Sequence, residues 1–274
     1  MIAARRSSLV WLCVLAACAC RAAAPRPDSG ADGASRAHGL GANGAVARAA
    51  ASPTEPAAAS DDDATAPVVP GDDEVSRLLV SLGVRIDRAR GVLEVDGWVN
   101  QREGVVEVFA CAPQGKTHES VVVLDCVPSG LQAGLLAIGL VPGAPAEQRA
   151  DGTEVPPTGD AVEIRVRWLD ADGEERSARA EDWVWLEGAG RTMAPRGWIF
   201  AGSYEQPASD GSGGVVFAAD QVKTLATTYR DTSTILENPA REAFDDTLYV
   251  ANPRAVPPVG TKLVATFRRA EVRP

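Results

Sequence analysis

The sequence predicts an α+β fold: a β-rich single domain of mostly antiparallel strands with one clear helix over about residues 128–139, preceded by a disordered tether. Three observations lead to this prediction. Short runs of alternating apolar and polar residues are separated by Gly, Pro, Asn and Asp, as in antiparallel sheets. One stretch repeats its apolar residues with a clear helical period. The segment 18–75 has almost no aromatic or branched apolar residues.

The folded part begins with four strand-like segments joined by turns. Their predicted ranges are 84–87, 93–99, 105–111 and 119–125. Short strands linked by tight turns usually pair with their chain neighbours in an antiparallel meander. We therefore expect the turn Pro113–Gly115 to pair the third strand with the fourth, which would set Cys111 nearly opposite Thr117 and His118.

A helix is predicted after the fourth strand. Leu131 and Leu135 lie on one helical face, Pro128 suits the first turn, and Gly139 can take the left-handed conformation that ends a helix. The residues that follow, 142–160, are rich in proline and acidic side chains. We expect them to form an irregular loop.

The second half of the domain is predicted to be mostly strands. Residues 162–168 alternate strictly between apolar and charged side chains, and Asp172-Gly173 would turn this strand into a partner over about 176–185. A short helix is expected around 222–228. Further strands are expected at 198–202, 215–217, 248–251 and 263–267.

Charge and composition exclude some partners. The 274 residues carry a formal net charge of -10, and no basic patch of the kind that binds phosphate backbones is visible. We therefore expect no nucleic-acid partner. The same acidic balance argues against attachment to a membrane through a basic protein surface.

The N-terminus resembles the signal peptide of a bacterial lipoprotein. Basic Arg5-Arg6 precede a short apolar run, 9–15, and Leu15-Ala16-Ala17-Cys18 is similar to a lipobox. The resemblance implies that residues 1–17 are removed and that Cys18 is lipidated as the new N-terminus. The protein would then be exported and anchored to a cell-envelope membrane. An alternative is an ordinary secretory signal cut near 22–24.

Residues 18–75 are interpreted as a disordered tether rich in Ala, Pro and Asp. Such a composition cannot bury enough apolar surface to offset the entropy lost on ordering. The acidic runs Asp61-Asp62-Asp63 and Asp72-Asp73-Glu74 would extend the chain by self-repulsion. The globular domain is expected to occupy residues 76–270.

Several short motifs resemble the YdjY-domain family of bacterial exported proteins, from Leu82 to about Phe267. They are Val95-Asp96-Gly97, Glu107 to Cys111, Gly115 to Ser120, Leu135 to Gly139, Pro142-Gly143, Trp198 to Ser203 and Pro257 to Thr261. The family has no established reaction, so the resemblance implies no catalytic roles.

One cluster of residues suggests chemistry. Cys111, His118 and Glu119 are candidate catalytic residues, since a thiol beside an imidazole can become a nucleophile, with Lys116 close by. The competing interpretation is a buried cysteine next to a surface His–Glu pair. An enzyme would need an accessible thiol, whereas a binding module can bury Cys111 completely.

Metal and cofactor sites are not indicated. Cys111, His118 and Cys126 have the spacing C-x6-H-x7-C and lack a fourth partner, so we predict no metal site and no cofactor. We also expect Cys111 and Cys126 to stay free of a disulfide, since a straight fourth strand would hold them at opposite ends. The tryptophans are expected to pack in the core more readily than to line a sugar groove.

Together these features predict a membrane-anchored envelope lipoprotein whose YdjY-like domain binds an unknown envelope protein or small ligand. The membrane contact would be the lipid on Cys18. The alternative is a thiol-dependent enzyme that uses Cys111 and His118.

Overall fold

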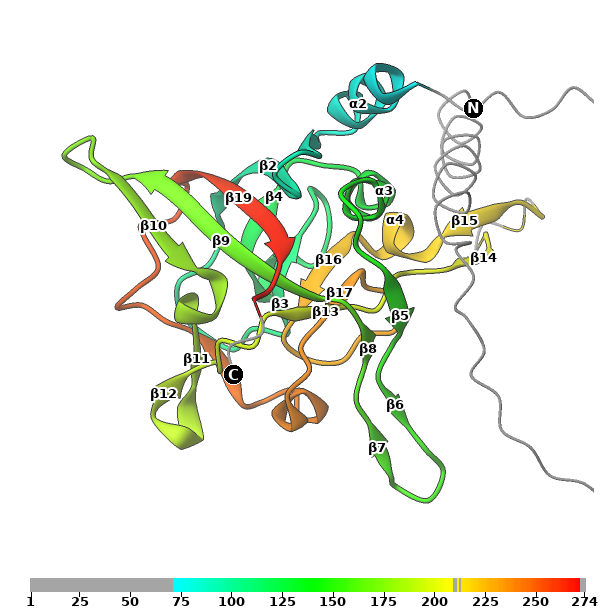
Figure 1. Ribbon diagram of the computed structural model, residues 1–274. Helices are drawn as coiled ribbons and strands as arrows, with labels where there is room; N and C mark the ends of the chain where they lie inside the picture. Colours follow the sequence, from blue (N-terminus) through cyan, green and yellow to red (C-terminus); the bar gives the residue numbers. More distant parts are fainter. Residues whose placement is uncertain (1–70, 209–210, 212, 272–274) are drawn as a thin grey trace, which may run out of the picture.

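The computed structural model describes residues 71–208, 211 and 213–271 (Figure 1). The expected signal peptide 1–17, the lipidation site Cys18 and residues 18–70 of the expected tether lie outside the described residues. Within the described part of the chain, no helix is long and apolar enough to cross a membrane.

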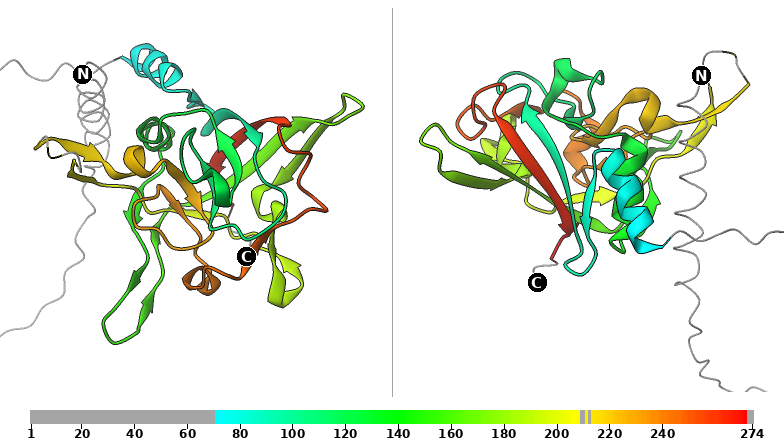
Figure 2. Two further views of the ribbon diagram at one scale, coloured as in Figure 1. Left: turned by 180° about the vertical axis from the view of Figure 1, so that it is seen from behind. Right: turned by 90° about the horizontal axis from the view of Figure 1, so that it is seen from above.

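Eight strands close into a β-barrel, which makes the domain β-rich as expected (Figures 1 and 2). The ring closes because β4 pairs with β2. Most neighbouring strands are antiparallel, and the pairs β16–β17 and β3–β4 are parallel. In ring order the strands are β2 (Val92–Val99), β19 (Lys262–Arg269), β9 (Ala161–Leu169), β13 (Trp198–Phe200), β17 (Leu236–Glu237), β16 (Thr224–Thr227), β3 (Val108–Cys111) and β4 (Ser120–Leu124).

Alternating side chains build the barrel wall. On β2 the apolar residues Leu93, Val95 and Val99 are buried, while their polar neighbours face outward. The same alternation confirms the predicted amphipathic strand in β9, where Ile164 and Val166 are buried. Two strands extend the wall: β1 (Arg85–Asp87) pairs with β2, and β10 (Glu175–Arg179) pairs with β9.

The predicted antiparallel hairpin between the third and fourth strands is wrong. β3 and β4 are parallel, and Cys111 has Val123 as its partner. All residues of both strands are buried, so no polar face favoured one direction over the other. The connecting residues 112–119 include the 3-10 helix η1 (Thr117–Glu119) and carry the chain back along β3.

Helix α3 (Pro128–Ala137) confirms the expected helix, with Gly139 at φ +90° just after its end. It lies between α2 (Asp72–Ser81) and α4 (Ala218–Val222), and almost all of its residues are buried. A glycine also lets the helix pack closely on the barrel: a Cβ on Gly134 would lie 2.4 Å from a methyl carbon of Leu93 in β2.

One helix was not predicted from the sequence, and one predicted helix needs correction. α2 begins at Asp72, so the folded domain starts before the expected boundary at residue 76, and Val75 and Leu79 pack in the core. The helix expected around 222–228 ends where that range begins, because Lys223 is left-handed after α4. The next residues, rich in threonine, form β16, since β-branched side chains favour strands.

The expected irregular loop at 142–160 is a long hairpin that projects from the barrel (Figures 1 and 2). We call it the arm. Its base pairs β5 (Pro142–Ala144) with β8 (Thr158–Gly159), and its outer half pairs β6 (Glu147–Gln148) with β7 (Glu154–Val155).

Small sheets and 3-10 helices complete the structure. The partner expected for β9 over 176–185 is shorter than predicted, because after β10 the chain turns into η2 (Ala180–Trp183). The predicted strands at 215–217 and 248–251 are confirmed. The remaining elements are β11 (Val184–Leu186), η3 (Glu187–Ala189), β12 (Arg191–Thr192), β14 (Glu205–Pro207), β15 (Val215–Phe217), η4 (Arg241–Phe244) and β18 (Tyr249–Ala251).

Candidate functional site

The candidate thiol lies inside the protein. Cys111 ends β3 with an exposed fraction of 0%, between its strand partners Val123 and Thr224. Burial raises the pKa of the Cys111 thiol, and a hydrogen bond with Ser120 only partly opposes this effect. A buried, protonated thiol is a poor nucleophile.

The other two candidates lie in the connection between β3 and β4. His118 is 78% exposed, and its Nε2 atom lies 3.7 Å from Oε2 of Glu119. The predicted pairing of His118 with Cys111 depended on the antiparallel hairpin, which the parallel register replaces. The structure therefore places His118 beside Glu119, and the Cys111 thiol stays buried.

Lys116 is the centre of this polar region. Its Nζ atom lies 3.1 Å from Oε1 of Glu119 and 3.7 Å from Oε2 of Glu107. Burial lowers the pKa of Lys116, but the contact with Glu119 and the negative charges of Asp231 and Glu107 outweigh it, so its pKa is raised. Burial and the charge of Glu119 raise the pKa of Glu107. Lys116 therefore stays a cation among carboxylates.

We define residues 112–119 as the Lys116 loop. Its backbone is held in place by side chains: the Nδ2 atom of Asn100 donates to the carbonyls of Thr117 and Ser120, and Oγ of Ser120 donates to the carbonyl of Lys116. Asn100 and Ser120 therefore both fix the loop backbone, so the loop side chains project from an ordered backbone.

The Lys116 loop also contains unusual backbone geometry. Gln114 at φ 68° and Lys223 at φ 62° are the non-glycine residues with positive φ in the described part of the chain. Gly115, the residue after Gln114, packs against Lys223, because a Cβ on Gly115 would lie 2.8 Å from Cβ of Lys223. Left-handed residues other than glycine cost energy and gather at functional sites. This strain singles out the loop as the candidate functional site.

Sequence reasoning missed part of this site. Glu107 was assigned to a strand and to a family motif but not to the site, and Asp231 and Lys223 come from a segment more than 100 residues away in the chain. No local pattern marks those two residues, since they reach the loop only through the pairing of β16 with β3.

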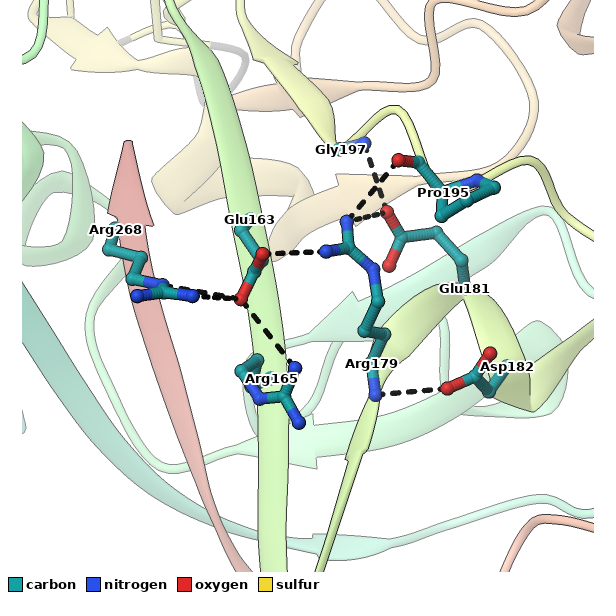
Figure 3. A network of polar contacts seen from close by, with 8 residues as sticks. All are labelled: Glu163, Arg165, Arg179, Glu181, Asp182, Pro195, Gly197 and Arg268. Carbon is teal, nitrogen blue, oxygen red and sulfur yellow. Dashed lines mark hydrogen bonds and ion pairs between the residues drawn. The ribbon is translucent and has the colours of Figure 1, made fainter. Parts of the chain in front are cut away.

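A second charged cluster lies on the outer face of β9 (Figure 3). Glu163 is almost fully buried and contacts Arg179 at 2.6 Å and Arg268 at 2.9 Å. Arg179 also contacts Glu181, whose Oε1 atom accepts a hydrogen bond from the backbone of Gly197. These bonds join β9, β19, η2 and the turn before β13, so the cluster is a structural clamp.

The residues that the sequence analysis considered as metal ligands lie in different surroundings. Cys126 is buried with a raised thiol pKa, whereas His118 is exposed. Among the residues that the structure describes, no group of three or more His, Cys, Asp or Glu side chains could hold a metal ion. Both described cysteines are free.

The tryptophans of the described residues are fully or partly buried. Trp183 and Trp198 are fully buried, and Nε1 of Trp198 donates to the carbonyl of Thr227. Trp168 lies edge-on to Trp183 with ring centroids 5.3 Å apart. This packing agrees with the core interpretation rather than with a sugar groove.

Comparisons with known proteins give one result. No curated protein and no solved structure matches the chain. The family model of the YdjY domain matches residues 84–268, which covers the barrel except the last residue of β19, the arm and the Lys116 loop. Because this match spans more than half of the sequence, the chain belongs to the YdjY domain family.

Proposed function

We propose that this protein is an exported lipoprotein, attached to a cell-envelope membrane by lipid on Cys18, whose YdjY domain binds an envelope protein or a small ligand through the Lys116 loop. The burial of Cys111 carries the choice of a binding module over a thiol enzyme. A binding domain can bury this thiol, whereas a nucleophile must meet its substrate.

The anchor is supported by the sequence. Leu15-Ala16-Ala17-Cys18 follows a short apolar run with a basic flank, as in lipoprotein signals. The composition of residues 18–70 suits a tether that would hold the domain away from the lipid surface.

The Lys116 loop is supported as the binding surface by its strain and its charges. The loop presents His118 to solvent beside a cation and two carboxylates. Such a set of opposite charges on a fixed backbone can recognise a partner by hydrogen bonds and charge complementarity.

Cell fractionation tests the anchor. In the Cys18→Ser variant, we expect the protein to leave the membrane fraction and its precursor to remain uncleaved, since the lipid acceptor is gone. Cys20→Ser is the matched control, because it changes a nearby cysteine outside the motif. Membrane fractionation of Cys18→Ser equal to that of the unsubstituted protein would show that another feature holds the protein there.

Affinity capture from envelope extract tests the binding surface. Lys116→Ala and His118→Ala should reduce capture of a specific partner at least about tenfold, since exposed polar hot spots contribute on the order of 1–2 kcal/mol. Arg90→Ala is the control, since Arg90 is an exposed cation in the turn between β1 and β2. Equal capture by all three variants would show that the binding surface lies elsewhere on the domain.

A further inference from the structure

The arm is attached to the barrel firmly at its base. A Cβ on Gly159 would lie 2.1 Å from the carbonyl oxygen of Phe200, so the backbone of β8 packs directly on that of β13. The backbone N–H of Phe200 also donates to the carbonyl of Asp160. Beyond this base the hairpin projects from the barrel (Figures 1 and 2).

Farther along, polar contacts seat the arm on the segment 228–244. They are Ala146 N to Glu237 Oε2 at 2.7 Å, Arg230 Nη2 to Gln148 Oε1 at 3.0 Å, and Arg241 Nε to Glu154 Oε2 at 3.1 Å. The last two are exposed, and exposed polar pairs stabilise little. The contact between Ala146 and Glu237 is buried, so the seating of the arm depends most on this carboxyl group.

Glu237 is buried where it meets Ala146 of the arm. The exposed fractions of Glu237 and Ala146 are 1% and 3%. The second carboxyl oxygen, Oε1, is buried and has no hydrogen-bond partner. A carboxylate buried in this way costs much more than a neutral carboxyl group, because its charge has lost most of its hydration.

Few charges surround Glu237. Asp231 and Arg230, from the segment before β17, are the charged groups that act on it, with opposite signs. Its neighbours in the flanking strands are Thr227 of β16 and Ile199 of β13, which carry no charge. On the arm itself, the charged residues next to Ala146 are exposed. Among the described residues, Arg230 is the cation that acts on Glu237, and the charge of Asp231 opposes it.

The acidity of Glu237 reflects this burial. Desolvation, with a contribution from the charge of Asp231, raises the pKa of Glu237 from 4.5 to about 7, although backbone hydrogen bonds from Ala146 and Asp231 and the charge of Arg230 act in the opposite direction. Lifting the arm would return the carboxyl group to water and to its ordinary pKa. The closed arm therefore binds a proton more tightly than an open arm.

We propose that the arm is a pH-dependent strap: it stays seated while Glu237 is protonated, and ionisation of Glu237 favours a state in which the arm lifts at Ala146. The sign follows from the raised proton affinity of the closed state. The equilibrium constant for closing of the arm falls about tenfold per pH unit between about pH 4.5 and pH 7, and it changes little above pH 7. This inference is independent of the proposed anchor and of the Lys116 loop.

Hydrogen exchange of the full chain tests the strap. The protection factor of the Ala146 amide, corrected for the intrinsic exchange rate, should fall at least about tenfold between pH 5 and pH 8. The Arg149 amide is an internal control, because it donates to the carbonyl of Thr153 within the arm itself. Its protection should stay constant. Equal protection of Ala146 at both pH values would overturn the proposal.

Matched variants assign the effect to Glu237. Glu237→Gln keeps an oxygen for the Ala146 N–H and cannot ionise, so it should hold Ala146 protected at pH 8. Glu147→Gln, an exposed neighbour on the arm, should keep the pH dependence. Persistence of the pH dependence in Glu237→Gln would also overturn the proposal.

If Glu237→Gln does not fold, a carbon-13 titration of the Glu237 carboxyl group in the unsubstituted protein decides. We expect the carboxyl group to titrate with a midpoint near pH 7 and the chemical shift of the Ala146 amide to change with the same midpoint. A midpoint near 4.5 contradicts the strap.

Discussion

Glu163 shows how one side chain departs from the pattern of its strand. It occupies an outward position of β9, where its sequence neighbours suggest a solvent-exposed charge. Instead, Arg179 and Arg268 cover it and bond to both of its oxygens (Figure 3). Burial alone would raise the pKa of Glu163, but Arg268, Arg179 and Arg165 outweigh it, and the pKa is lowered.

A lowered pKa gives a defined pH dependence. Glu163 stabilises the fold above the ordinary glutamate pKa, and this contribution is lost as pH falls through the lower folded-state pKa. We expect Glu163→Gln to lower the free energy of unfolding at pH 7 by about 2–4 kcal/mol, because two arginines lose their buried partner. Urea denaturation at several pH values measures this loss of stability. The difference in unfolding free energy between the variant and the unsubstituted protein should narrow below about pH 4.

Glu175→Gln is the control for that experiment. Glu175 lies 3.7 Å from Arg167 on the same sheet face, but its side chain is 63% exposed. An exposed pair contributes about 0–1 kcal/mol, so this variant should change little. Equal losses in both variants would contradict the view that burial gives the Glu163 clamp its strength.

At the scale of elements, α2 is the main addition to the predicted fold. Its first turn is acidic, which suits the positive end of a helix dipole, and Val75 and Leu79 bury against the core. The same acidic residues favoured a tether when judged by composition alone. Only the docking of the helix beside α3 shows that they begin the folded domain.

Two truncations test where the domain begins. A chain starting at Gly71 should keep the melting temperature of the full chain. A chain starting at Leu82 loses two buried side chains, which corresponds to roughly 3–5 kcal/mol and to a fall of about 10 °C in melting temperature. Calorimetry measures both. A large fall on removal of residues 1–70 alone would mean that this segment packs on the domain.

At the scale of the whole molecule, the barrel depends on a close approach at Gly97. This residue of β2 pairs with Leu263 of β19 on one side and with Leu124 of β4 on the other. A Cβ here would lie 2.3 Å from the carbonyl oxygen of Val123. Gly97 therefore lies where the sheet closes on itself, which gives a physical reason for glycine in this family motif.

Replacement of Gly97 tests barrel closure. Gly97→Ala should destabilise the domain by about 2–3 kcal/mol, since the added methyl group meets backbone and a buried leucine. Gly188→Ala is the matched control, because a Cβ at Gly188 would meet no atom within 4 Å. Denaturant titration should show a lower midpoint for Gly97→Ala alone. Equal midpoints for the two variants would show that the closure can relax around a larger residue.

Local sequence patterns determined much of this fold. The alternation in β2 and β9, the helical period of α3 and its end at Gly139 were all predictable, because each depends on residues close in sequence. The YdjY motifs likewise identified the family from the chain alone. These features need no knowledge of which strands pair.

Tertiary structure alone decided the rest. β3 and β4 are apolar on both faces, so their sequence does not fix a direction of pairing, and the parallel register replaced the predicted pairing of Cys111 with His118. Asp231 and Lys223 reached the Lys116 loop, and Glu237 reached the arm, through contacts between distant segments. Burial then set the protonation of Cys111 and Glu237, because desolvation depends on everything that surrounds a group, and a linear sequence does not contain that surrounding.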